Sequence, residues 1–391
     1  MLHAVTDITL IDGTGAEPAP DSAVVWDGPT FTYVGPSADA PLDGVEILAR
    51  RGYALPGLID SHVHLTFDAT LEGVDGVASD PIDEVRERAM ENARILLGAG
   101  ITSARDQGSR DSLAIEVAQA QRSGELRAAR ILAAGRGITP TGGHGWMIGV
   151  EADGPEGVAA AVRTEIERGA DVIKLFPTGG VLGSGSHGYD VVMSADELRA
   201  AVEVAHEHGL LIAAHVHGRE GIDAVLDAGI DTIEHATDIT TEQAERCAGA
   251  GVALVPTLAG IHYALDRRDT LPPDLAERAE KVFEAQQAGI ARAIEAGARV
   301  LPGTDAGTPF NPVGNLVQEM ILLSDLGQGN LGAITAGTSL AAETLRLEGL
   351  GRVASGATAD LVVVSGDPAA SLGALWEPPL VVQAGDPVGT R

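Results

Sequence analysis

The chain has 391 residues, of which 45% are hydrophobic, so it is long enough to bury a large core. Its formal net charge of −30 at pH 7 argues against a nucleic acid or an anionic membrane surface as a partner. The single cysteine excludes an intramolecular disulfide, and the first residues do not combine a basic region with a long apolar run. We therefore expect a cytoplasmic protein.

Both ends of the chain are patterned as short strands separated by Gly and Pro, which is typical of a small β unit. The candidate strands cover residues 8–11, 23–26, 31–34 and 45–48 at the start of the chain, and 361–364 and 380–382 near its end. Because the two β-rich ends flank a different middle, we predict that residues 1–55 and 350–391 pair into one small β-sandwich domain.

Residues 56–349 alternate between apolar strands and amphipathic helices. The candidate strands begin near Ala54, Ile101, Arg130, Asp171, Leu210, Asp231, Val252 and Arg299. The longest helix is expected over residues 273–297, and Ser194 with Glu197 fits a capping box. Eight such units predict an α/β fold of the (β/α)₈ TIM-barrel type. A doubly wound open sheet is the alternative, although no Gly-x-Gly-x-x-Gly follows the first strand.

Polar residues stand where several of these strands end. His62 and His64 follow the first strand two residues apart, so their side chains share a face at the mouth of the barrel. His215, His235 and Asp305 end three other predicted strands. Imidazole and carboxylate groups are the ligands that zinc prefers, so this set predicts a hydrolytic metal centre.

Lys174 is one of only two lysines, the other being Lys281, among 26 basic residues. It lies in the apolar run 171–176, where a buried lysine can lose its proton, as an arginine cannot. A neutral lysine amine can add carbon dioxide, and the resulting carbamate could bridge two ions ~3.5–4 Å apart. The alternative is an ion pair between Lys174 and a carboxylate, either Asp171 or Asp106.

These residues resemble the amidohydrolase superfamily over nearly the whole chain. The segments that carry the resemblance are 56–64, 233–235 and 303–307, while 140–145, 169–174 and 214–218 resemble its Xaa-Pro dipeptidase and imidazolonepropionase-like branch. Mononuclear imidazolonepropionases do not use a lysine on the fourth strand in this way, so Lys174 favours the dipeptidase side.

The resemblance implies two divalent metal ions, with zinc the first choice and manganese or iron also suited to the ligands. The implied ligands are His62, His64 and Asp305 for one ion, His215 and His235 for the other, and the carbamate of Lys174 as the bridge. A hydroxide shared by the ions would attack an amide carbonyl, and Asp305 would carry its proton to the leaving nitrogen.

Three further residues are candidates for substrate contacts. His144, in a Gly-rich loop, could reach the substrate carbonyl or carboxylate and assist catalysis, or make only a loop hydrogen bond. His217 shares a face with His215 and could orient the substrate, or be structural. Tyr189 and the Gly-rich stretch 179–188 fit a lid over the mouth.

The function that the sequence predicts is a binuclear amidohydrolase that cleaves an amide bond in a dipeptide or an N-acyl amino acid. The alternative activity is hydrolysis of a cyclic amide, lactone, ester or carbamate, as in imidazolonepropionase-like enzymes. A non-catalytic assembly protein is disfavoured because the ligand set is complete. The expected partners are a small-molecule substrate and further copies of the chain in a homo-oligomer.

Overall fold

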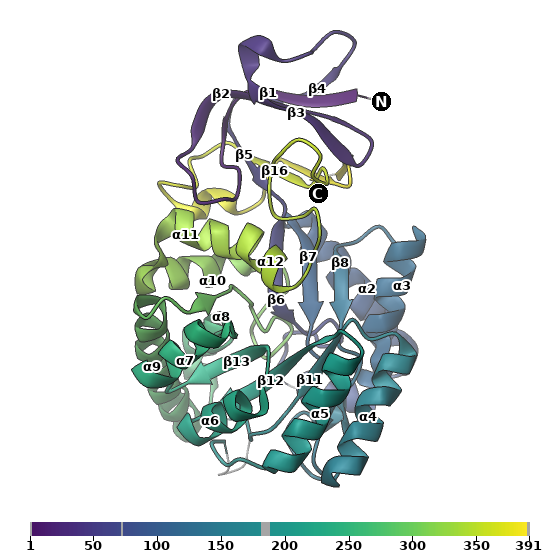
Figure 1. Cartoon of the computed structure of the whole chain (residues 1–391), viewed down its shortest axis with the longest axis vertical. Coiled ribbons are helices and arrows are strands. Elements are labelled where there is room, and N and C mark those ends of the chain that lie inside the picture. Colours follow the sequence, from purple (N-terminus) through teal and green to yellow (C-terminus); the bar gives the residue numbers. More distant parts are fainter. Residues whose placement is uncertain (1, 72, 181–187, 389–391) are drawn as a thin grey trace.

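The computed structural model describes residues 2–71, 73–180 and 188–388, and Figure 1 shows a β-rich end and a larger α/β part. No helix within these residues is long and apolar enough to cross a membrane.

Strands from both ends of the chain form one eight-stranded sheet. Its strands are β1 (Leu2–Leu10), β2 (Ala19–Asp27), β3 (Thr30–Pro36), β4 (Glu46–Arg50), β5 (Tyr53–Pro56), β16 (Leu361–Val364), β17 (Leu380–Gln383) and β18 (Asp386–Val388). β5 runs antiparallel to β16, and the buried indole Nε1 of Trp26 donates to the carbonyl of Gly385 at 2.9 Å. The expected pairing of the two ends is therefore present, while their arrangement as a sandwich remains a prediction.

The α/β part contains eight strands that match the predicted ones, together with two short strands, β9 and β10. The first of the eight begins at Leu58 and not near Ala54, because Ala54 lies in β5 of the terminal sheet. The strands are β6 (Leu58–Val63), β7 (Ile101–Asp106), β8 (Arg130–Ala133), β9 (Gly137–Thr139), β10 (Gly149–Glu151), β11 (Val172–Leu175), β12 (Leu211–His217), β13 (Thr232–Thr237), β14 (Ala253–Val255) and β15 (Arg299–Val300). They pair in parallel as a three-stranded sheet, β6-β7-β8, and a seven-stranded sheet, β10-β9-β11-β12-β13-β14-β15.

No continuous ladder closes the described strands into a barrel, but backbone hydrogen bonds join the two sheets at two places. Ser61 N donates to Pro302 O at 3.0 Å, so the first strand lies beside the chain that follows the last. Asp171 N donates to Ala133 O at 2.8 Å on the other side. The predicted α/β class with parallel strands is confirmed, and contact between the first and last strands is not a feature of open doubly wound sheets.

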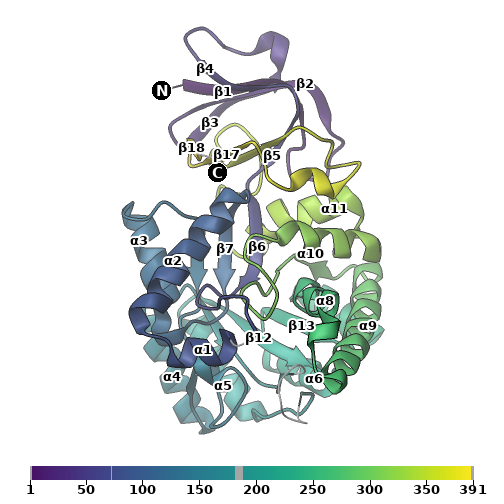
Figure 2. The ribbon, with the colours of Figure 1, turned by 180° about the vertical axis from the view of Figure 1, so that it is seen from behind.

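The helices lie outside the strands in both views (Figures 1 and 2). They are α1 (Gly73–Ser79), α2 (Ile82–Gly98), α3 (Leu113–Ser123), α4 (Gly154–Arg168), α5 (Ala195–Glu207), α6 (Arg219–Ala228), α7 (Thr241–Ala250), α8 (Leu258–Asp266), α9 (Pro273–Glu295), α10 (Leu316–Leu323), α11 (Gly329–Thr335) and α12 (Ala341–Thr344). The predicted capping box of α5 is confirmed, because Ser194 accepts from the amide of Glu197 and Glu197 accepts from that of Ser194.

The carboxyl ends of the strands point away from the terminal sheet, as the arrowheads of β7 and β8 show in Figure 1. Several residues at these ends have a left-handed backbone, with φ of 67° at His235, 57° at Thr257 and 56° at Asp305 among them. A left-handed backbone is costly for residues other than glycine and is commonly retained at functional sites. This rim is therefore the first place to look for a site.

Candidate metal centre

A cavity of about 510 Å³ opens at the carboxyl ends of the strands. All but one of the predicted site residues line it, namely His62, His64, His144, Lys174, His215, His217, His235 and Asp305. Tyr189 is not part of the lining; it is 43% exposed, and its ring lies 6.3 Å from that of His217. The predicted lid falls largely on residues 181–187, which lie outside the described residues.

His62, His64 and Asp305 form one group whose ligand atoms lie within 4.8 Å of one another. The Nε2 atoms of the two histidines are 3.4 Å apart, and each lies 3.3 Å from Oδ1 of Asp305. The second nitrogen of each ring is already engaged: Nδ1 of His62 lies 2.7 Å from Oε2 of Glu234, and Nδ1 of His64 lies 2.9 Å from the carbonyl of Gly108.

These partners determine which ring nitrogen carries the proton. Burial alone would raise the pKa of Glu234, but the Arg105 guanidinium and His62 hold it well below its usual range. This side chain is therefore an ionised carboxylate that only accepts hydrogen bonds. The carbonyl of Gly108 also only accepts, so both Nδ1 atoms donate and both Nε2 atoms present lone pairs. Two lone pairs and a carboxylate oxygen that converge without a donor fit a bound cation.

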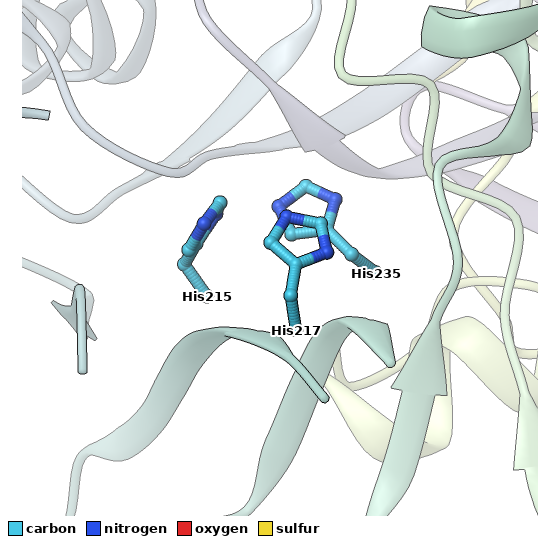
Figure 3. Close-up of side chains that lie close together, drawn as sticks. All are labelled: His215, His217 and His235. Atoms are coloured by element: carbon cyan, nitrogen blue, oxygen red, sulfur yellow. The ribbon is translucent and has the colours of Figure 1, made fainter. Parts of the chain in front are cut away.

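His215, His217 and His235 form a second group, again with ligand atoms within 4.8 Å of one another (Figure 3). The rings of His217 and His235 are stacked with centroids 5.0 Å apart, and the ring of His215 lies 4.5 Å from that of His235. His217 had been expected to orient the substrate, but the structure places it among the candidate ligands.

Hydrogen bonds also orient this second group. Nε2 of His215 lies 3.1 Å from the carbonyl of Gly179, so Nδ1 is the nitrogen left to bind. Nδ1 of His235 lies 2.6 Å from the hydroxyl of Thr257, whose own proton goes to the carbonyl of Pro256. His235 therefore presents Nε2 to the cavity.

Burial keeps the histidines of this region neutral. It lowers the pKa of His217 to about 3 and that of His144 to about 4, and neighbouring cationic groups add to the shift. Burial and adjacent imidazoles also place the pKa values of His215 and His235 well below the usual range. A neutral imidazole is the form that binds a metal ion.

Lys174 is 1% exposed, and its Nζ atom has no hydrogen-bond partner among the described residues. Burial lowers the pKa of the amine to about 8. The ion pairs that were the alternative are not formed: Asp171 pairs with Arg122 at 2.6 Å, and Asp106 accepts from the amide of Leu65 at 2.8 Å. An unpaired buried amine beside the two groups fits the predicted carbamate, which would satisfy it.

Glu234 and Arg105 were not predicted as site residues. Glu234 contacts His62 of the first group, and Arg105 contacts Glu234. Both are fully buried, and Nη2 of Arg105 donates to Oε1 of Glu234 at 2.9 Å. Arg105 also donates to the carbonyl of Ser61 at 2.7 Å and to the hydroxyl of Thr232 at 2.9 Å. The available signal was the presence of charged residues inside these two strands, Arg105 and Asp106 in β7 and Glu234 in β13.

We expect Glu234→Gln to destabilise the protein by about 3 kcal/mol, because it leaves the buried Arg105 without a counter-charge. Weaker orientation of His62 is expected to lower metal affinity by about 10- to 100-fold. Urea denaturation and metal titration measure the two effects. Glu116→Gln is the control, since it breaks an exposed pair with Arg86 and is expected to cost about 1 kcal/mol or less. Equal stability of the two variants would contradict the role of Glu234.

A parallel α/β fold that gathers buried histidines and an aspartate at the carboxyl ends of its strands is the arrangement of a metal-assisted hydrolase. Comparison with known families gives the narrower assignment. The chain belongs to the amidohydrolase family, whose model matches residues 53–388, and it is a hydrolase that acts on C–N bonds.

The relatives are hydrolases of several kinds. The chain is 28% identical to ochratoxinase of Aspergillus niger over 95% of this chain and 83% of that protein. It is 25% identical to imidazolonepropionase of Salinispora tropica over 91% of this chain and 90% of that protein. A Xaa-Pro dipeptidase crystallised with methionine in its active site superimposes with a TM-score of 0.90 at 28% identity, covering 99% of this chain and 100% of the other. The resemblance found in the sequence is therefore confirmed.

Proposed function

We propose that the protein is a binuclear amidohydrolase that cleaves the amide bond of a dipeptide or an N-acyl amino acid. The observation that carries the proposal is the buried, unpaired amine of Lys174, which lines the same cavity as both candidate metal groups. The relatives of the protein include a Xaa-Pro dipeptidase and ochratoxinase, and this similarity supports an amide substrate.

His62, His64 and Asp305 would hold one divalent ion, and His215 and His235 the other, with Lys174 as a carbamate between them. Such ions, most simply zinc, supply Lewis acidity and a hydroxide at neutral pH. His217, placed among the histidines of the second group, is either a further ligand of that ion or a contact to the substrate.

Asp305 is the residue that we assign to proton transfer. Its Oδ1 atom lies 3.3 Å from Nε2 of both His62 and His64, and as an ionised carboxylate it can serve as a base. It would accept a proton from the attacking water and deliver it to the leaving nitrogen. His144, neutral and in the same cavity, would donate a hydrogen bond to the substrate, and Tyr189 would contact it from the rim.

The second candidate function is hydrolysis of a cyclic amide, lactone, ester or carbamate. Its support is the imidazolonepropionase relative. A library of dipeptides, N-acyl amino acids, cyclic amides and lactones distinguishes the two functions by which class gives the higher kcat/KM.

We further propose that the strands of residues 56–349 close as a TIM barrel, and that residues 1–55 and 350–391 form a β-sandwich beside it. The hydrogen bonds between the two sheets and the close superposition on a solved Xaa-Pro dipeptidase support the barrel. We also retain the homo-oligomer as a proposal, which a sedimentation measurement of mass tests.

Reconstitution of the stripped enzyme is expected to depend on bicarbonate, because the carbamate of Lys174 takes its carbon from carbon dioxide. Metal added in degassed buffer should restore little activity, and metal with bicarbonate should restore most of it. Carbon-13 bicarbonate should add a carbamate signal to the NMR spectrum, which Lys174→Ala abolishes. Full recovery without bicarbonate, with no such signal, would contradict the bridge.

A further inference from the structure

Helices α8 and α9 form an apolar wall of the cavity. The wall consists of Ile261 and Ala264 from α8, Leu271 from the connection between the helices, and Leu275 and Ala279 from α9. Leu275 and Ala279 are four residues apart and so share one helix face, as their places in the lining show. Ile261 and Ala279 also belong to a small hydrophobic cluster of their own. The wall is thus a packed surface built by these two helices.

This wall adjoins the proposed proton carrier. Gly260 on α8 lies so close to Asp305 that a Cβ atom placed on it would be 3.7 Å from Oδ2. In the proposed function Asp305 delivers a proton to the leaving nitrogen, so that nitrogen must come within hydrogen-bond distance of Oδ2. A nitrogen at that place lies beside Gly260 of α8, so its substituent can extend along the wall of α8 and α9.

The charges of the lining favour an uncharged side chain against this wall. Among the described residues that line the cavity, Lys174 is the sole lysine or arginine and Asp305 the sole carboxylate, and both belong to the proposed metal centre. A charged substituent against Ile261 or Leu275 would lose its water without gaining a partner, whereas an apolar one gains by leaving water. Leu271 and Leu275 are half-buried, so they keep apolar surface open to an occupant.

We propose that the α8–α9 wall is a subsite for a large apolar side chain on the amino acid that leaves. The inference rests on the proposed amidohydrolase function and adds its substrate class: N-acyl amino acids, or dipeptides, whose leaving residue is of the leucine or phenylalanine type.

The first test is a series of N-acetyl amino acids with glycine, alanine, valine, leucine or phenylalanine as the leaving residue. We expect kcat/KM to rise about threefold to fourfold for each added methylene, the gain typical of apolar burial. Aspartate and lysine as leaving residues should be the poorest substrates. A second series varies the acyl group and keeps the leaving residue. A stronger dependence on the acyl group than on the leaving side chain would overturn the assignment.

The second test places a charge in the wall. Leu275→Lys should lower kcat/KM for N-acetyl-leucine by about tenfold or more, and raise it for N-acetyl-glutamate, because the new ammonium pairs with that side chain. Glu284→Lys adds a positive charge at an exposed position of the same helix and should leave the leucine-to-glutamate preference unchanged. Metal content and Tm establish that each variant is folded. An unchanged preference in folded Leu275→Lys would overturn the subsite.

Product binding separates failure of the subsite from failure of the proposed function. Calorimetry with free leucine, glutamate and glycine reports on the wall even if no amide is hydrolysed. Tighter binding of leucine, reversed in Leu275→Lys, would support the subsite even with no amide turned over. Turnover of amides with no preference among leaving side chains would retain the function and refute the subsite. If no amide is turned over and leucine does not bind preferentially, both the proposed function and the subsite are refuted.

Discussion

Lys174→Ala is expected to lose one of two metal ions per chain and to lower kcat/KM by more than about a hundredfold. The loss of a bridging ligand should exceed the 10- to 100-fold effect typical of residues that only orient ligands. Nζ of Lys174 has no hydrogen-bond partner among the described residues, and the carboxylates of Asp171, Asp106 and Glu234 are already engaged by other groups. Removal of the amine therefore removes the proposed bridge and leaves the separate histidine groups.

Metal analysis after extensive dialysis measures this loss, with activity determined on the same samples. Lys281→Ala is the matched control, since it removes the other lysine, which is exposed and paired with Glu277 at 2.6 Å. The control should keep both ions and full activity. Two tightly bound ions in Lys174→Ala would refute the bridge. Undiminished turnover in Lys174→Ala would refute a role of the bridge in catalysis.

Asp305→Asn is expected to keep part of its metal and to lose turnover by about 10²- to 10⁴-fold, the range of general acid–base catalysis. Asparagine retains an oxygen that can bind an ion, but it cannot accept and return a proton. Nε2 of His62 and of His64 would remain in place, because Glu234 and Gly108 fix these rings from the opposite side.

The leaving group separates the two roles of Asp305. An activated anilide needs little protonation of its nitrogen, so Asp305→Asn should impair it much less than an ordinary alkyl amide. A purely metal-binding role would slow both substrates to the same extent. A near-normal kcat on the alkyl amide would exclude the proton transfer altogether.

Much of this arrangement could be predicted from the sequence, because it is encoded by local pattern. All eight predicted strands are present, and the capping box of Ser194 is formed as expected. Residues such as His62 and His64 could be selected because parallel strands place their carboxyl ends on one rim. Lys174, the single lysine inside an apolar run, could likewise be identified from the sequence.

Other features depend on contacts between residues far apart in the chain. Glu234 and Arg105 are 129 positions apart, and only the packing of β7 near β13 brings the guanidinium to the carboxylate. The place of His217 among the candidate ligands likewise depends on the tertiary structure, which stacks its ring on that of His235 from the neighbouring strand β13.

The sequence alone determined the alternation of strands and helices, the polar residues at strand ends and the isolated lysine, because each depends on hydrophobic period and residue chemistry along a short stretch. The tertiary structure decided which nitrogens are free to bind an ion, which charges pair behind them and which helices form the apolar wall. These depend on distances between separate elements, and such distances are fixed only when the whole chain packs.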